Sequence, residues 1–112
     1  MLNETFERVE NMCGGKGHVI IKHILDEKHR NKLCRMYAQV TLEPGCSLGY
    51  HEHHGESETY YILSGKGMYD DNGEKVPVKA GDITYTPDGK GHGLENVGDT
   101  DLVFMALILL DD

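Results

Sequence analysis

Short apolar stretches separated by turn residues constrain the fold of this chain more than any other feature. Residues 33–42 alternate between apolar and polar side chains, residues 58–63 form a second strand pattern, and Asn72-Gly73 marks a hairpin turn. Such turn signals recur about every 8 to 12 residues, and the sequence contains no amphipathic helix of useful length. At 112 residues, the chain has room for one domain with one core. We therefore predict a single all-β domain, either a sandwich or a barrel.

Residues 102–110 form the last predicted strand and are apolar on both faces. One face would point into the core, so the other face needs cover from a second sheet or from a second subunit. We predict a homodimer from this strand. A monomer whose second sheet covers both faces is the alternative.

The charge balance excludes several classes of partner. The chain carries 11 basic and 19 acidic residues, whereas a surface for nucleic acid or for an anionic membrane needs clustered Lys and Arg. The apolar run at residues 102–110 is too short for a membrane span, which needs about 20 residues. The N-terminal residues show no signal-peptide pattern, and an odd number of cysteines (Cys13, Cys34 and Cys46) fits reduced thiols. We therefore expect a cytoplasmic protein that binds neither nucleic acid nor a membrane.

Three histidines and one glutamate are candidate metal-binding residues, namely His51, His53, Glu58 and His92. His51 and His53 are two residues apart, so both imidazoles project from the same face of an extended strand. Glu58 follows a predicted turn and His92 comes much later in the chain, so only a closed sheet would bring all four together. Three neutral imidazoles and one carboxylate suit divalent Mn, Fe, Co, Ni, Cu or Zn, and suit Mg and Ca poorly. Four protein ligands would leave two positions of an octahedral ion open.

The residues around these four candidates resemble the paired signature motifs of the cupin superfamily at every fixed position. The matching positions are Gly45, His51, His53, Glu58 and Gly65, followed by Gly81, Pro87, Gly89, His92 and Asn96. The resemblance covers residues 33–110 and implies a double-stranded β-helix, or jelly-roll barrel, that is often dimeric. We expect this cupin barrel over residues 33–112, after an N-terminal lead-in with the first strand or strands over residues 1–32. The resemblance also implies that His51, His53, Glu58 and His92 hold one divalent Mn, Fe, Ni or Zn ion inside the barrel.

Tyr60 is a candidate for binding a small molecule beside the ion. If Glu58 points into the barrel, Tyr60 on the same strand face does so as well and can hydrogen-bond a metal-bound ligand. An aromatic residue that simply packs in the strand is the alternative. Glu52 and Glu56 lie close to the first motif, and we interpret both as solvated surface charges.

The strand predicted over residues 33–42 can offer either of two faces to the barrel. We favour the apolar face, because apolar faces usually pack inside; it consists of Met36, Ala38 and Val40. The alternative is the polar face, which consists of Arg35, Tyr37 and Gln39. In that orientation Arg35 and Gln39 become substrate-binding candidates, with Arg35 holding a carboxylate through two hydrogen bonds.

The ligand set and the resemblance together favour a metalloenzyme acting on a small oxygenated metabolite, such as a carboxylate, a keto acid or a diketone. Its chemistry would be similar to that of decarboxylase-like or dioxygenase-like cupins. A sugar or sugar-phosphate isomerase similar to phosphomannose isomerases is one alternative, and a cupin that binds a small molecule without turning it over is another. A phosphorylated substrate has less support, because the chain has only three arginines and no basic cluster.

Overall fold

Two antiparallel sheets account for the regular structure of residues 1–111, the part of the chain that the computed structural model describes. These residues contain ten strands, one short 3-10 helix and no α-helix, and no helix among them is long and apolar enough to cross a membrane. The elements are β1 (Thr5–Glu10), η1 (Met12–Gly14), β2 (His18–His23), β3 (Cys34–Leu42), β4 (Ser47–Glu52), β5 (Glu56–Ser64), β6 (Lys66–Asp71), β7 (Glu74–Lys79), β8 (Ile83–Thr86), β9 (Gly91–Asn96) and β10 (Leu102–Leu110). The predicted all-β fold is confirmed.

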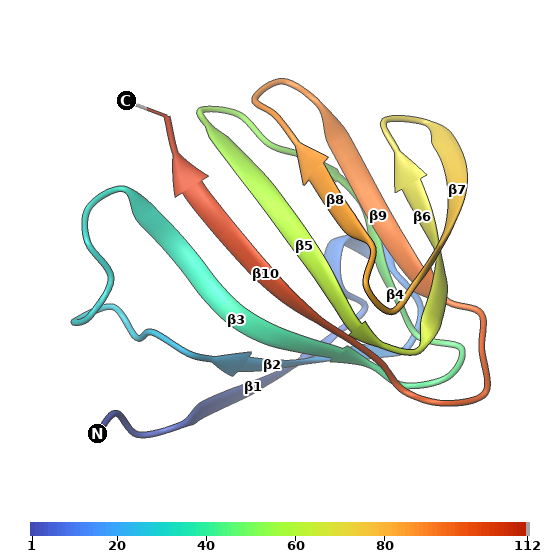
Figure 1. Cartoon of the computed structure of the whole chain (residues 1–112), viewed down its shortest axis with the longest axis horizontal. Helices are drawn as coiled ribbons and strands as arrows, with labels where there is room; N and C mark the ends of the chain where they lie inside the picture. Colours follow the sequence, from blue (N-terminus) through green and yellow to red (C-terminus); the bar gives the residue numbers. More distant parts are fainter. Residues whose placement is uncertain (112) are drawn as a thin grey trace.

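The strand order makes the molecule a jelly-roll barrel. One sheet has the order β1-β2-β3-β10-β5-β8, and the other has the order β4-β9-β6-β7. From β3 to β6 successive strands alternate between the larger and the smaller sheet, and from β7 to β10 they alternate again, starting in the smaller sheet. The chain therefore winds as a double helix of strands. Figure 1 shows β10 between β3 and β5 in the larger sheet. The predicted double-stranded β-helix is therefore confirmed.

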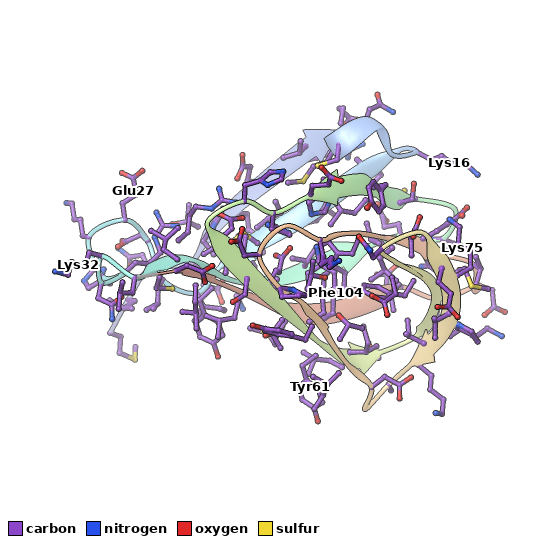
Figure 2. The ribbon with its side chains drawn as sticks, turned by 90° about the horizontal axis from the view of Figure 1, so that it is seen from above. Lys16, Glu27, Lys32, Tyr61, Lys75 and Phe104 are labelled. Atoms are coloured by element: carbon purple, nitrogen blue, oxygen red, sulfur yellow. The ribbon has the colours of Figure 1, made fainter. Side chains whose placement is uncertain are left out.

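The core lies between the two sheets. On β3 the apolar face points inward, as favoured from the sequence, and its buried members are Ala38, Val40 and Leu42. Tyr37 and Gln39 alternate with these residues on the opposite face of the strand. Phe104 on β10 lies inside the barrel, whereas Tyr61 on β5 projects from its outer surface (Figure 2).

The pairing of β3 with β10 is interrupted at Arg35. Ile108 pairs with Met36 and Leu109 pairs with Cys34, which leaves Arg35 without a partner on β10. An extra residue of this kind forms a β-bulge, which redirects a side chain. The bulge explains why Arg35 and Met36 line the same cavity, although a regular strand would direct adjacent side chains to opposite faces.

Residues 1–32 supply β1, η1 and β2. Strand β2 pairs with β3 and buries Val19 and Ile21 in the core, while β1 forms an edge that extends away from the barrel (Figure 1). Helix η1 packs against β4 so closely that a Cβ atom at Gly49 would lie 2.0 Å from the carbonyl oxygen of Cys13. Glycine at position 49 therefore permits the two backbones to meet.

The outer face of β10 is apolar, as the sequence indicates. Val103, Met105 and Leu107 are partly buried within the chain, and Leu109 is exposed. The homodimer stays a prediction.

Candidate metal centre

The four predicted metal-binding residues meet inside the barrel. One ligand atom of each residue lies within 4.8 Å of the corresponding atoms of the other three. The Oε1 atom of Glu58 is 2.9 Å from the Nε2 atoms of both His53 and His92, and 3.7 Å from Nε2 of His51. The Nε2 atoms of His53 and His92 are 3.0 Å apart. These four residues form a cluster compatible with a single metal ion.

Three strands and one turn position this cluster. His51 on β4 lies directly opposite His92 on β9, and Glu58 lies on β5 in the facing sheet. His53 follows the end of β4, where its backbone amide donates to the carbonyl oxygen of Lys90. Because the four side chains come from both sheets, they can converge only when the barrel closes.

The Nδ1 atoms of His51 and His53 have partners that accept a proton. His51 Nδ1 lies 2.8 Å from the carbonyl oxygen of Gly49, and a carbonyl can only accept, so this nitrogen carries the hydrogen. His53 Nδ1 donates to the carboxylate of Glu56. A proton on Nδ1 lets each Nε2 present its lone pair to an ion at the cluster, which is the tautomer that a metal-binding histidine needs. Without an ion, Nε2 can instead carry a hydrogen and donate it to Glu58.

His92 is held by two hydroxyl groups. Its Nδ1 atom lies 2.8 Å from the hydroxyl of Tyr69 and 2.9 Å from Oγ1 of Thr86. A hydroxyl can accept the Nδ1 proton, so His92 can adopt the same tautomer as the other two histidines. The sequence did not indicate Tyr69 or Thr86, because neither occupies a fixed motif position and both reach His92 only through strand pairing.

Glu56 is not the solvated surface charge predicted from the sequence. Its side chain is buried, and its two oxygens face Arg35, with Nε to Oε1 at 2.7 Å and Nη2 to Oε2 at 2.9 Å. Arg35 therefore does hold a carboxylate through two contacts, and that carboxylate is Glu56 of the same chain. Burial raises the pKa of Glu56, but hydrogen bonds from Arg35 and His53 outweigh this effect and hold the pKa below its ordinary value.

The charge on the cluster is set mainly by Glu58. Burial raises the pKa of Glu58, but its interactions with the three histidines lower it by more, so the pKa lies well below its ordinary range and the group is ionised. Burial lowers the pKa of His92, which favours its neutral imidazole. The hydrogen bond to Glu58 raises the pKa of His53. An anionic carboxylate among imidazole nitrogens is a donor set that suits a divalent transition metal.

A cavity of about 170 Å³ opens beside the cluster. His51 and Glu58 form part of its wall, and Tyr60 contributes a buried hydroxyl that has no hydrogen-bond partner within residues 1–111. The Tyr60 ring stacks on His92 with the ring centroids 4.7 Å apart, so this residue both packs in the core and lines the cavity. Gln39 lies on the outward face of β3, and the structure does not bring it to the site.

Comparison with known families agrees with this geometry. Residues 38–108 match the family described as "Cupin domain". The chain belongs to the cupin family. The match begins inside β3 and ends inside β10, so it includes every residue of the cluster.

A curated protein and a solved structure from Thermotoga maritima are both similar to this cupin. The curated protein is described as an oxalate-binding protein and is 49% identical over 106 residues, which make up 95% of this chain and 88% of the relative. The solved structure is described as the crystal structure of a predicted oxalate decarboxylase; it is 48% identical with a TM-score of 0.92, and the match covers 96% of this cupin and 94% of that chain. A shorter match, 37% identical over 75 residues, covers 62% of this cupin and 20% of an oxalate decarboxylase from Bacillus subtilis. This cupin therefore has an oxalate-binding homologue.

Proposed function

We propose that this cupin binds one divalent transition-metal ion through His51, His53, Glu58 and His92, and binds a small oxygenated carboxylate beside it. The observation that carries this proposal is the convergence of the four side chains, within 4.8 Å of one another, at the wall of a cavity. The oxalate-binding homologue supports a carboxylate as the class of ligand, and oxalate is the first compound to test.

The residues present fit such an ion. The donor set suits Mn, Fe, Ni or Zn, and the partners on the Nδ1 atoms fix the orientation of each imidazole. A divalent ion held there would act as a Lewis acid toward a carboxylate or keto group. Tyr60 would donate its buried hydroxyl hydrogen to a ligand oxygen, which removes the cost of a buried donor without an acceptor.

We extend the proposal to turnover of the bound carboxylate by decarboxylase-like or dioxygenase-like chemistry, which the cavity beside the cluster supports. A phosphosugar isomerase has less support, because a phosphate group needs a cation to bind it. Among residues 1–111, the one cationic side chain that lines the cavity is Arg35, and Glu56 already neutralises it.

The test begins with protein purified without added metal. We expect elemental analysis, followed by titration with Mn²⁺, Fe²⁺, Ni²⁺ and Zn²⁺, to give one ion per chain. Calorimetry should then show oxalate binding that requires the ion. His92→Ala should abolish both, whereas the control His54→Ala should retain both, because the side chain of His54 is 72% exposed and lies outside the cluster. A wild-type protein that binds none of these ions would refute the proposal.

Turnover is tested separately, by mass spectrometry of the metal-loaded protein after long incubation with oxalate. Products that appear in wild-type samples and are absent with His92→Ala would support an enzyme. Full binding of oxalate without any product would restrict the function to binding for that compound.

We also propose that this cupin works as a homodimer. The support is an exposed apolar surface on the outer face of the six-stranded sheet, formed by Tyr61, Leu63, Ile83, Tyr85 and Leu109. Light scattering should give the mass of two chains, and Ile83→Asp should give the mass of one. A monomeric wild-type protein at micromolar concentration would contradict this expectation.

A further inference from the structure

The cavity beside the cluster is apolar over most of its wall. Nine of its fourteen lining residues have aliphatic, thioether or phenyl side chains, and they include Val19, Ile21, Val40, Leu48, Phe104 and Ala106. His51 and Glu58 belong to the same wall, so a ligand that reaches the cluster also meets this apolar surface. Oxalate consists of two joined carboxylates and has no apolar part to place there. The wall therefore fits a ligand that carries hydrocarbon as well as oxygen.

The charges around the cavity favour a ligand with a single negative charge. A divalent ion together with the Glu58 carboxylate and three neutral imidazoles leaves one net positive charge. Arg35, the one cationic residue found in the cavity wall of the described chain, is paired with Glu56 at 2.7 and 2.9 Å, and this pair is neutral. A monoanion would leave the site neutral. A dianion would leave an uncompensated charge against an apolar wall, which is unfavourable.

The hydroxyl of Tyr60 places a further requirement on the ligand. It is buried beside the Glu58 carboxylate and forms no well-aligned hydrogen bond within residues 1–111. A buried donor without an acceptor is unfavourable, so a ligand with a suitably placed oxygen gains affinity by supplying one. A carboxylate with a neighbouring keto group offers three oxygens, enough for both the cluster and Tyr60.

We infer that the preferred ligand is a 2-oxo monocarboxylate with an apolar tail of a few carbons, its oxygens toward the cluster and Tyr60 and its tail against the apolar wall. The cavity is large enough, since an apolar cavity of about 150 Å³ accommodates benzene and this cavity measures about 170 Å³. The inference rests on the proposed metal-dependent binding of a carboxylate and narrows the class of ligand.

The test is a series of ligands that share one head group and differ in the tail. Calorimetry with the Mn²⁺-loaded protein should show pyruvate, 2-oxobutanoate and 2-oxopentanoate binding more tightly in that order, by about fourfold for each added CH2 group. An affinity that stays constant or falls as the tail lengthens would overturn the inference. Metal-dependent oxalate binding together with a flat series would refute this inference alone, whereas no metal-dependent binding of any of these compounds would refute the proposed function.

A matched pair of ligands tests the charge argument. The compounds 2-oxopentanoate and 2-oxopentanedioate have the same head and chain length, and differ in ending with a methyl group or a second carboxylate. We expect the dicarboxylate to bind at least about tenfold more weakly, because its second charge would meet an apolar wall and a neutralised Arg35. Equal or tighter binding of the dicarboxylate would overturn the inference and would mean that Arg35 leaves Glu56 for the ligand.

A pair of variants on β10 tests where the tail lies. Ala106→Val adds volume to the cavity wall and should remove the gain in affinity along the series, whereas Leu107→Ile on the opposite face of the strand should retain it. A folded Ala106→Val protein that keeps the full gain would overturn the placement of the tail. If that variant does not fold, the affinities of the wild-type protein along the ligand series still test whether an apolar tail is preferred.

Discussion

Replacing Glu56 with alanine should weaken metal binding about 10- to 100-fold, although Glu56 is not one of the four cluster residues. Its carboxylate accepts the Nδ1 proton of His53, and both side chains are buried, with 10% exposure for Glu56 and 4% for His53. In the metal-free variant His53 can move this proton to Nε2, where Glu58 accepts it. In the metal-bound form the ion occupies the Nε2 lone pair of His53, so the proton must stay on Nδ1 without an acceptor. The free-energy cost of the lost acceptor therefore weakens metal binding.

The magnitude follows from the burial of His53. An unsatisfied buried donor costs about 1–3 kcal/mol, and each factor of ten in affinity corresponds to about 1.4 kcal/mol. Glu56→Gln keeps an acceptor oxygen but loses the negative charge. A hydrogen bond to a charged group is worth roughly 1 kcal/mol more than one to a neutral group, so we expect the metal affinity of this variant to fall about fivefold.

The assay is competition for Mn²⁺ or Zn²⁺ against a chromophoric chelator, with circular dichroism to verify folding. Glu52→Gln is the matched control, because the side chain of Glu52 is 54% exposed, lies outside the cluster and forms an ion pair with the exposed His54 at 3.5 Å. That variant should bind metal as the wild type does. A folded Glu56→Ala protein whose affinity stays within about twofold of the wild type would refute the reasoning.

Three further predictions follow from the site. Because the folded state holds the pKa of Glu58 below its ordinary 4.5, the stabilisation from its ionised form is complete above that pH and is lost as the pH falls below it. Urea unfolding of the metal-free protein should therefore show the free energy of unfolding falling from about pH 5 to about pH 3, and falling less in Glu58→Gln. Tyr69→Phe removes one of the two hydroxyls beside His92 Nδ1, and since the other remains at 2.9 Å, metal affinity should fall by no more than about fivefold in the chelator assay. Gly49→Ala would place a Cβ atom 2.0 Å from the Cys13 carbonyl oxygen and so push η1 off β4, and we expect a lower Tm together with weaker ligand binding by calorimetry.

The sequence predicted the barrel and the cluster because both leave short-range patterns in the sequence. The alternation in residues 33–42 identified Ala38 and Val40 as inward, and a strand with period two has no other way to bury them. The motif spacing likewise identified the residues that meet at the cluster, since His51 and His53 share a face and the turns aim His92 at them.

The surroundings of the cluster could not be predicted in the same way. Glu56 shares its strand face with Glu58 and Tyr60, so the period-two pattern did contain a signal that it points inward. An acidic residue beside a turn is nevertheless usually solvated, and Glu56 is buried because Arg35 reaches it. Arg35 reaches it through the β-bulge opposite β10, and a bulge of this kind has no signature in the alternation of residues 33–42.

The central place of β10 in the larger sheet has a consequence for biosynthesis. This strand pairs with β3 on one side and β5 on the other, and both of those strands leave the ribosome well before it does. Until then β3 and β5 each present an unpaired edge, which is the kind of surface that chaperones protect from aggregation. The larger sheet can therefore close only after residues 102–110 have been synthesised and have paired with both strands.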